Sequence, residues 1–273
     1  MPDFQSRTLL QIRQSVGRNT GAVIVGAASA LGATTSLIDT YGMAKGGDNE
    51  YKGRQVLITS TVTGGAAVGQ KSFVASSDGT TKTATLSPAV NAEIKAAQAY
   101  EMWQGLTVED VQNFINEAIQ DASGLMYVDK DDVTLTSVAG TYEYSVPAGF
   151  VAIHTIEYLS GSVYYPLRSG EWDILRASGK IVLTPGGLSV SGATTLRLRG
   201  YEMPSLMAAD TDVADIDPAY VIAAATAKAL ASNLVTPELD TKARTTRLGY
   251  WQGVADRLKK ERETAVMPGT RWL

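Results

Sequence analysis

The stretch 107-TVEDVQNFINEAIQDA-122 does most to set the type of fold. Thr107 places a hydroxyl three residues before Asp110, an arrangement typical of a helix cap. Apolar side chains then recur every three or four residues, at Val108, Val111, Ile115, Ala118, Ile119 and Ala122. Gly124 follows where a left-handed residue often ends a helix. The stretch therefore predicts an amphipathic helix with one face packed against the rest of the chain.

Further helices are predicted toward both ends of the chain. A short one covers residues 4–16, and an alanine-rich one covers 217–234, opening with an Asp-Pro pair that favours a helix start. A third lies within 238–263, where seven basic and five acidic residues indicate a mixed, solvated face. Its apolar stripe consists of Leu248, Trp251, Ala255 and Leu258.

Between and before these helices the pattern is typical of short strands and turns. Alternation of apolar and polar residues, as in Thr194-Thr195-Leu196-Arg197-Leu198-Arg199, favours strands with one face in a core. The predicted strands are 54–62, 72–75, 82–86, 141–146, 151–159, 163–167, 180–184 and 194–200.

We therefore expect an α+β fold, an α-helical bundle with inserted antiparallel β-strand domains. Residues 126–204 are expected to form a β-rich domain, 19–100 an extended arm with a small β insertion, and 264–273 a C-terminal tail. The discontinuous helical bundle is expected to comprise 1–18, 101–125 and 205–263.

The composition restricts the possible functions. The chain has one histidine and no cysteine, which excludes thiolate nucleophiles, cysteine metal sites and paired-histidine ligand sets within one chain. Only 19% of residues are charged, against roughly 25% in typical soluble domains, so some surface is expected to contact another subunit. The net charge of −4 gives no electrostatic basis for gripping phosphates.

Two stretches near the N-terminus imitate other functions. Residues 23–32 resemble a dinucleotide-binding glycine turn, and Tyr41 and Lys45 have dehydrogenase-like spacing. The turn lacks its middle glycine at Ala30, and the Tyr-Lys pair follows too closely for the strands between. Residues 19–38 carry no charge and reach the length of a membrane span, but their Gly, Ser and Thr content is poor for a lipid-phase helix. We expect an arm or loop with some strand, no membrane partner, and an intracellular product.

Other polar groups are candidates for sites on weak grounds. Residues 129–132 have carboxylates at cation-ligand spacing but lack the glycine of a calcium loop, so a surface turn is expected. His154 alternates with apolar residues and is expected to be packed or solvent-facing. Glu157, Glu171 and Asp173 are the carboxylates from which an acid/base pair could be built. We predict no enzyme activity and assign no catalytic, cofactor-binding or metal-binding residue.

The succession of elements resembles the layout of tailed-bacteriophage head-to-tail adaptor proteins. The resemblance covers about residues 51–234 and is carried by the segments 51–59, 99–103, 108–116, 140–150 and 196–204. It implies a dodecameric ring below the portal protein in the virion neck, assembled in the host cytoplasm and joined to a tail or tail-terminator protein. It also implies that genomic DNA passes through the lumen without specific binding. The C-terminal residues that would contact the portal are Arg271, Trp272 and Leu273.

Physical arguments are compatible with such a ring. A heterologous interface that closes on itself would cover neutral surface, and an acidic chain suits a channel along which DNA slides. Two alternatives remain. One is another phage tail or baseplate/receptor-binding structural protein, expected as a trimer that engages sugars through Tyr158, Tyr164 and Tyr165. The other is a hydrolase that uses carboxylates in the β region.

Overall fold

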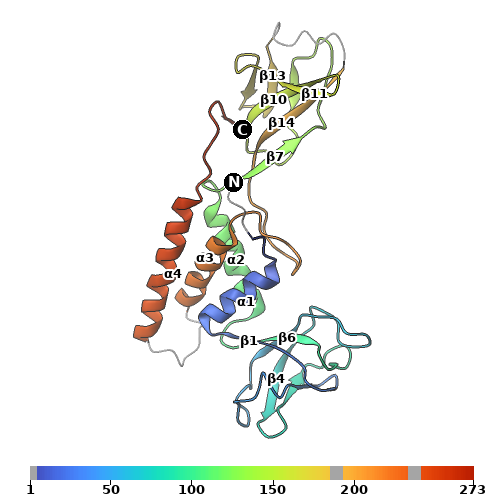
Figure 1. Ribbon diagram of the computed structural model, residues 1–273, viewed down its shortest axis with the longest axis vertical. Helices are drawn as coiled ribbons and strands as arrows, with labels where there is room; N and C mark the ends of the chain where they lie inside the picture. The colour runs from blue at the N-terminus through green and yellow to red at the C-terminus, as the bar shows by residue number, and fades with distance from the viewer. Residues whose placement is uncertain (1–4, 185–192, 233–240) are drawn as a thin grey trace. The chain divides into compact units, whose positions relative to one another are not determined.

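The structure is a computed structural model that describes residues 5–184, 193–232 and 241–273 (Figure 1). The chain divides into two compact units. The first comprises Met1–Ala118 and Met207–Leu258, and the second comprises Ile119–Leu206 and Lys259–Leu273. Each unit is therefore assembled from two separate parts of the sequence.

The first unit contains a six-stranded antiparallel sheet with the order β1-β6-β3-β4-β5-β2. Its strands are β1 (Val23–Ala27), β2 (Ser36–Ile38), β3 (Gln55–Ile58), β4 (Lys71–Asp78), β5 (Thr83–Ser87) and β6 (Ala99–Trp103). Along β5, Ala84 and Leu86 are buried while Thr85 and Ser87 are exposed, because successive side chains of a strand point to opposite faces. The two buried residues join a continuous core with Leu37.

The uncharged stretch expected to be an arm or loop with some strand contains β1 and β2. Within the core, Tyr100 Oη donates a hydrogen bond to Asp39 Oδ2 over 2.6 Å. A Cβ at Gly26 would lie 2.7 Å from Asp39 Oδ2 and 2.9 Å from Tyr100 Oη. Gly26, which imitates a phosphate-binding glycine in the sequence, thus permits close packing of β1 over a buried hydrogen bond.

The described residues contain four helices: α1 (Leu9–Thr20), α2 (Val108–Ala122), α3 (Pro218–Ala231) and α4 (Thr241–Glu261). Side-chain caps fix where α1 and α3 begin. Helix α1 begins with a reciprocal capping box between Thr8 and Gln11. Helix α3 begins where the Asp217 carboxylate accepts from Ala219 N over 2.8 Å. Nearly all of α3 is buried, since its alanines allow close approach, and it packs against α1.

A buried ionic cluster joins three elements of the first unit. Arg13 of α1 is 1% exposed, and its Nε donates to Glu101 Oε2 of β6 over 2.9 Å. Its Nη1 donates over 2.5 Å to Asp210, which precedes α3. Trp103 Nε1 also donates to Glu101 Oε2, over 3.0 Å. Burial lowers the pKa of Arg13, but Asp210 and Glu101 raise it by more, so the pKa lies above its usual value and the guanidinium stays charged.

The second unit is built from two antiparallel sheets. One has the order β11-β10-β14-β7, with β8 paired to β14 and β15 paired to β10, and the other has the order β12-β13-β9. The strands are β7 (Val128–Asp132), β8 (Thr136–Ser137), β9 (Glu143–Ser145), β10 (Ala152–Ser160), β11 (Val163–Pro166), β12 (Trp172–Leu175), β13 (Lys180–Leu183), β14 (Thr194–Glu202) and β15 (Arg271–Trp272). Apolar residues from both sheets, including Ile156, Trp172 and Ile181, share one core.

The predicted fold class, an α-helical bundle with inserted antiparallel β-strand domains, is wrong. Most elements are antiparallel strands, with fifteen strands and four helices in the described ranges. Two clusters of buried apolar residues lie largely on the sheets. Long helices give a strong periodic signal, whereas short strands of small and polar residues give a weak one, so the sequence overstates the helical part.

Individual elements fared better than the fold class. The helix predicted at 107–122 is confirmed as α2, and the alanine-rich helix as α3, although residue 234, where it was expected to end, lies outside the described residues. The predicted N-terminal helix corresponds to α1, which begins at Leu9; residue 4 is likewise outside the described part. The surface turn expected at 129–132 is wrong, because these residues belong to β7 and pair with β14.

Candidate assembly surface

The three residues predicted to contact a portal lie on the second unit. Strand β15 pairs with β10, with Ala152 opposite Trp272 and Ile153 opposite Arg271. Leu273 N donates to Val151 O over 3.1 Å, and the Leu273 residue is 38% exposed. The end of the chain thus completes part of the edge of its own sheet.

Arg271 is held by three contacts within this unit. Its guanidinium carbon lies 4.1 Å from the ring centre of Trp172. Its Nε donates to Asp173 Oδ1 over 2.7 Å, and its Nη2 donates to Ser169 O over 2.5 Å. The pKa of Asp173 is lowered, first because its carboxylate accepts from Ile174 N and also because Arg271 is close. These contacts fix the orientation of Arg271 within its own unit.

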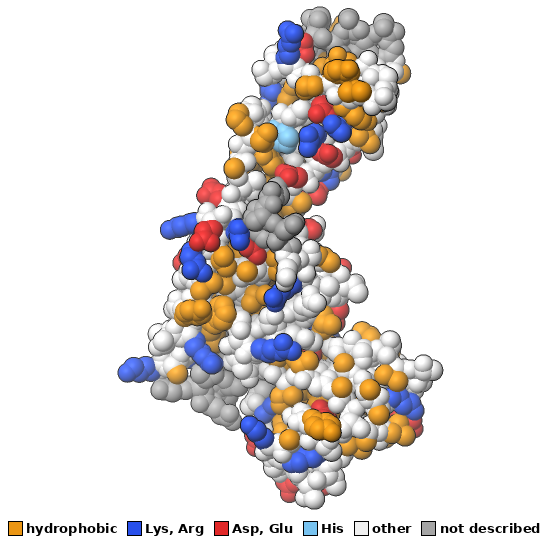
Figure 2. Space-filling view, in the orientation of Figure 1, with side chains coloured by type: hydrophobic (Ala, Val, Ile, Leu, Met, Phe, Trp, Pro, Cys, Tyr) orange, Lys and Arg blue, Asp and Glu red, His pale blue; other side chains and the backbone are white. Residues whose placement is uncertain are grey.

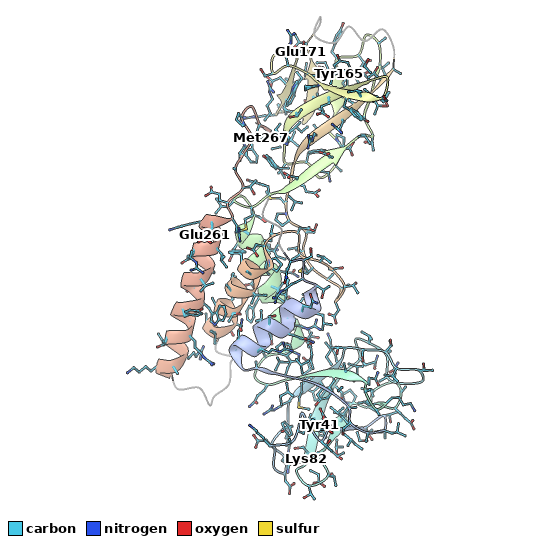
Figure 3. The ribbon with its side chains drawn as sticks, viewed as in Figure 1. Tyr41, Lys82, Tyr165, Glu171, Glu261 and Met267 are labelled. Atoms are coloured by element: carbon cyan, nitrogen blue, oxygen red, sulfur yellow. The ribbon has the colours of Figure 1, made fainter. Side chains whose placement is uncertain are left out.

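Trp272 belongs to an aromatic cluster on the same sheet. Its ring centre lies 5.2 Å from that of Tyr127, which in turn lies 5.9 Å from Tyr201. The segment before β15 is fastened to this cluster, since Tyr127 N donates to Thr264 Oγ1 over 2.8 Å and Met267 N donates to Tyr201 Oη over 3.1 Å. Figure 3 labels Met267 on this segment. The tail is tied to its own unit.

His154 stands at the edge of this cluster, 5.3 Å from Tyr201 between ring centres. Its pKa is lowered because burial disfavours the charged imidazole and Arg199 repels it, against the opposite influence of Asp129, Asp131 and Glu157. The folded unit therefore favours neutral His154. The contribution of neutral His154 to the free energy of unfolding is fully present above the pKa of the unfolded chain. It is lost as the pH drops from that value toward the lowered pKa of the folded chain.

We predict that the single imidazole of the folded chain titrates below 6.5, the ordinary histidine value. NMR of the histidine Hε1 proton measures this without ambiguity, because no second histidine contributes a signal. The denatured chain is the control and should titrate near 6.5. A folded midpoint at or above the denatured one would contradict the described burial of His154.

The carboxylates considered for a hydrolase are held by separate partners. Glu157 pairs with Arg197 across β10 and β14, and Glu171 accepts from Arg168 N over 2.8 Å (Figure 3). Asp173 is paired with Arg271, as described above. Within the described residues, no group of three or more acids and histidines is placed to hold a metal ion. Each of the three carboxylates therefore makes its own structural contact.

The tyrosines considered for sugar binding lie on the hairpin of β10 and β11. Tyr158 and Tyr165 have ring centres 5.8 Å apart, and Arg197 lies 4.3 Å above the ring of Tyr164. Tyr165 is exposed (Figure 3). Tyr158 and Tyr165 are opposite each other in the pairing of β10 with β11, whereas Tyr164 precedes Tyr165 and points to the other face of the hairpin, so the three rings do not form one cluster.

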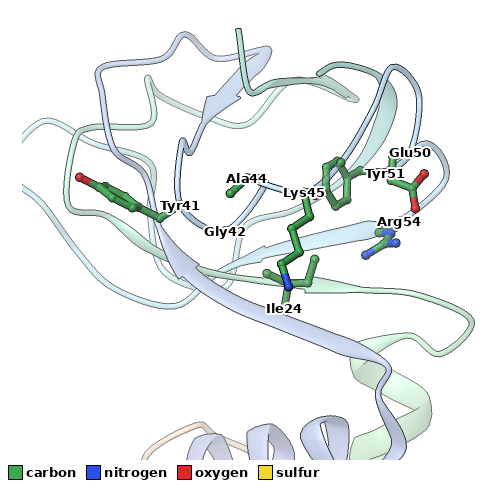
Figure 4. A pocket seen from close by; sticks show the side chains of 9 residues that line it. Ile24, Tyr41, Gly42, Ala44, Lys45, Glu50, Tyr51 and Arg54 are labelled. Carbon is green, nitrogen blue, oxygen red and sulfur yellow. The ribbon is translucent and has the colours of Figure 1, made fainter. Parts of the chain in front are cut away.

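Tyr41 and Lys45 line an open pocket of 430 Å³ in the first unit, together with Tyr51 and Arg54 (Figure 4). Tyr41 is 85% exposed, and Figure 4 shows its ring pointing away from Lys45. Acid/base chemistry requires both groups within reach of one reacting atom. The geometry therefore does not support the dehydrogenase-like pair that the spacing imitates.

Sequence reasoning missed one surface, the exposed side of α4. The range 238–263 reads as a mixed charged face, but α4 itself contains six basic and two acidic residues. Counting charge within the bounds of the helix would have revealed the excess.

No helix in the part of the chain that the structure describes is long and apolar enough to cross a membrane.

Comparison with known proteins identifies a family for this chain. No curated protein matches the chain. Comparison with protein families matches residues 81–271 to the family described as SU10 adaptor protein, which is more than half of the 273 residues. The chain belongs to the SU10 adaptor family. It is a structural adaptor of a bacteriophage and a component of the virion.

The matched range relates the adaptor family to particular elements. It includes α2, α3, α4 and nearly all of the second unit, as far as Arg271, while α1 and β1 to β4 lie outside it. The family match confirms the resemblance to phage adaptor proteins that the sequence suggests.

Proposed function

We propose that this SU10 adaptor forms a dodecameric ring in the virion neck, below the portal protein, and links the capsid to a tail or tail-terminator protein. The observation that carries the proposal is the family match over 81–271. The low charged fraction of 19% supports it, because neutral surface is suited to contacts between copies. A heterologous contact repeated around an axis closes into a ring.

In this role the ring lines the DNA channel and has no chemistry of its own. A net charge of −4 per copy makes the ring acidic as a whole, which suits an acidic lumen. Such a lumen repels phosphates and lets the genome slide without specific binding. The ring assembles in the host cytoplasm and involves no membrane.

We also propose that Arg271, Trp272 and Leu273 contact the portal. Strand β15 is held on β10 by the contacts of Arg271 and Trp272, and Leu273 beyond it is 38% exposed, so this end of the sheet offers a fixed edge to a portal segment. Trp272 provides a large apolar anchor of the kind that dominates many interfaces.

Trp272→Ala and Leu273→Asp are each expected to weaken portal binding by roughly tenfold or more, because an anchor residue contributes about 2 kcal/mol. Val266→Ala, in the same tail and exposed like Leu273, is the matched control and should bind normally. Co-sedimentation with the purified portal measures the affinity, and thermal unfolding checks that each variant is folded. Unchanged binding by both folded variants would remove these residues from the portal contact.

The position in the particle is tested by electron microscopy of gold-labelled virions. A peptide tag inserted at Gly69, an exposed turn residue, carries the gold label. We expect gold at the junction of head and tail. Gold at the tail tip or baseplate would contradict the neck assignment and favour a receptor-binding part.

A further inference from the structure

Helix α4 is poorly covered by its own chain. Among the α4 side chains that the structure describes, Ala255 alone is buried. Four apolar side chains are only half-buried: Leu248, Trp251, Val254 and Leu258. Tyr250 is 64% exposed. Because helices in proteins are stabilised mainly by packing of an apolar face, this exposure points to a partner that covers α4.

The charge of α4 is opposite to that of the chain as a whole. Its six Lys and Arg against two Asp and Glu give a net charge of +4. The rest of the chain, with 18 basic and 26 acidic residues, therefore carries −8. Figure 2 shows Lys and Arg side chains along the region of α4. The uncovered helix is thus also the most basic element of an acidic protein.

A hollow beside α4 concentrates this charge. It has a volume of 520 Å³ and is lined by Arg18 at the end of α1 and by Arg247, Tyr250 and Trp251 of α4, with Asn19 and Thr246. Both arginines are exposed. Paired guanidinium groups beside aromatic rings suit a carboxylate carried on a protein surface.

Such a surface exists elsewhere in the first unit. Helix α2 contains four acidic residues and no basic one, and it exposes Glu109, Asn113 and Glu117, which at a spacing of four lie on one face. The segment 208–217 contains four aspartates and no basic residue. Asp215 is exposed and Asp212 half-buried, whereas Asp210 pairs with Arg13 and Asp217 caps α3, so the first two carry the surface charge of this segment. Asn116 Nδ2 of α2 donates to Met207 O over 3.0 Å, so the two acidic elements are neighbours. We call them together the acidic face.

Helix α3 separates the acidic face from α4 (Figure 1). On one side Lys228 of α3 lies 3.4 Å from Glu117 of α2. On the other, Arg244 Nε of α4 donates over 2.8 Å to Leu230 O, near the end of α3. The acidic face therefore lies on one side of α3 and basic α4 on the other. In a head-to-tail contact, such opposite sides of successive copies meet.

We infer that α4 of one copy docks on the acidic face of the next copy, with Arg18 and Arg247 receiving carboxylates. This inference rests on the proposed ring and specifies which surfaces form it. The second copy is preferred to DNA as the occupant because the complementary charge is present on the chain itself. The contact is electrostatic in part, so assembly weakens as salt rises.

A charge-reversal series tests the interface. Arg18→Glu with Arg247→Glu is expected to weaken assembly of the 273-residue chain on the portal by roughly tenfold or more, because like charges then meet across the contact. Adding Asn113→Lys and Glu117→Lys to the same chain restores attraction and is expected to recover assembly. The matched control is Lys52→Glu with Arg176→Glu, two exposed cations outside α4 and the hollow.

Native mass spectrometry of each mixture counts the bound copies, and thermal unfolding confirms that each variant is folded. Loss in the first variant, recovery in the fourfold variant and no change in the control support the inference. If the first variant assembles like the wild type, the inference is wrong although the ring stands. If it loses only binding of a double-stranded DNA fragment, α4 faces DNA and the inference is also wrong. If the wild type never assembles, the proposed function itself fails.

Discussion

Replacing Arg13 by methionine is expected to lower the free energy of unfolding of the first unit by about 3–5 kcal/mol, the range for removing one partner of a buried ion pair. Glu101 is 0% exposed, so it would remain a buried charge with Trp103 Nε1 as its neutral donor. Denaturant unfolding followed by tryptophan fluorescence reports the change, since Trp103 contacts the cluster.

Two further variants separate the ionic effect from loss of packing. Arg13→Met combined with Glu101→Gln removes the stranded charge and is expected to recover at least half of the loss. Arg7→Met, at an exposed position just before α1, should change the free energy of unfolding by no more than about 0.5 kcal/mol. If Arg13→Met is as mild as Arg7→Met, the cluster does not join α1, β6 and the segment before α3 as described.

Gly200→Ala is expected to destabilise the second unit by about 3 kcal/mol, near the upper end for overpacking of a core. Gly200 lies opposite Ile153 in the pairing of β14 with β10. A Cβ there would stand 2.0 Å from Ala152 O and 2.9 Å from the Phe150 ring. The carbonyl is backbone, so the strands themselves must separate. Thermal unfolding measures the effect.

Gly170→Ala is the matched control in the same unit. No atom lies within 4 Å of a Cβ at that position, so a change within about 0.5 kcal/mol is expected. Equal stability of the two alanine variants would mean that β10 and β14 do not approach at Gly200 as the structure has them.

The sequence predicted helices more reliably than the architecture that contains them. Val108, Val111 and Ile115 repeat at helical spacing because α2 buries one face, and this local pattern is sufficient for a correct prediction. Strand β1 has no comparable pattern, since its residues are partly buried on both sides and include a glycine. Its position depends on pairing with β6, more than seventy residues later, which no local signal contains.

The candidate assembly surface was predictable in part for similar reasons. The resemblance to phage adaptors points to Trp272 as a contact residue, but its contact with Tyr127 depends on the fold of the whole second unit. The exposure of α4 depends on which neighbours the tertiary structure supplies, so periodicity predicted its stripe without showing how little of it is covered. The charge of α4 was readable from residue types alone.

The most direct test of the account is the mass of the complex that the adaptor forms with its portal protein, measured by native mass spectrometry. We expect a dodecamer of this chain on the portal, whether the free chain is a monomer or already a ring. A stable trimer, or a chain that remains monomeric and does not bind the portal, would contradict it.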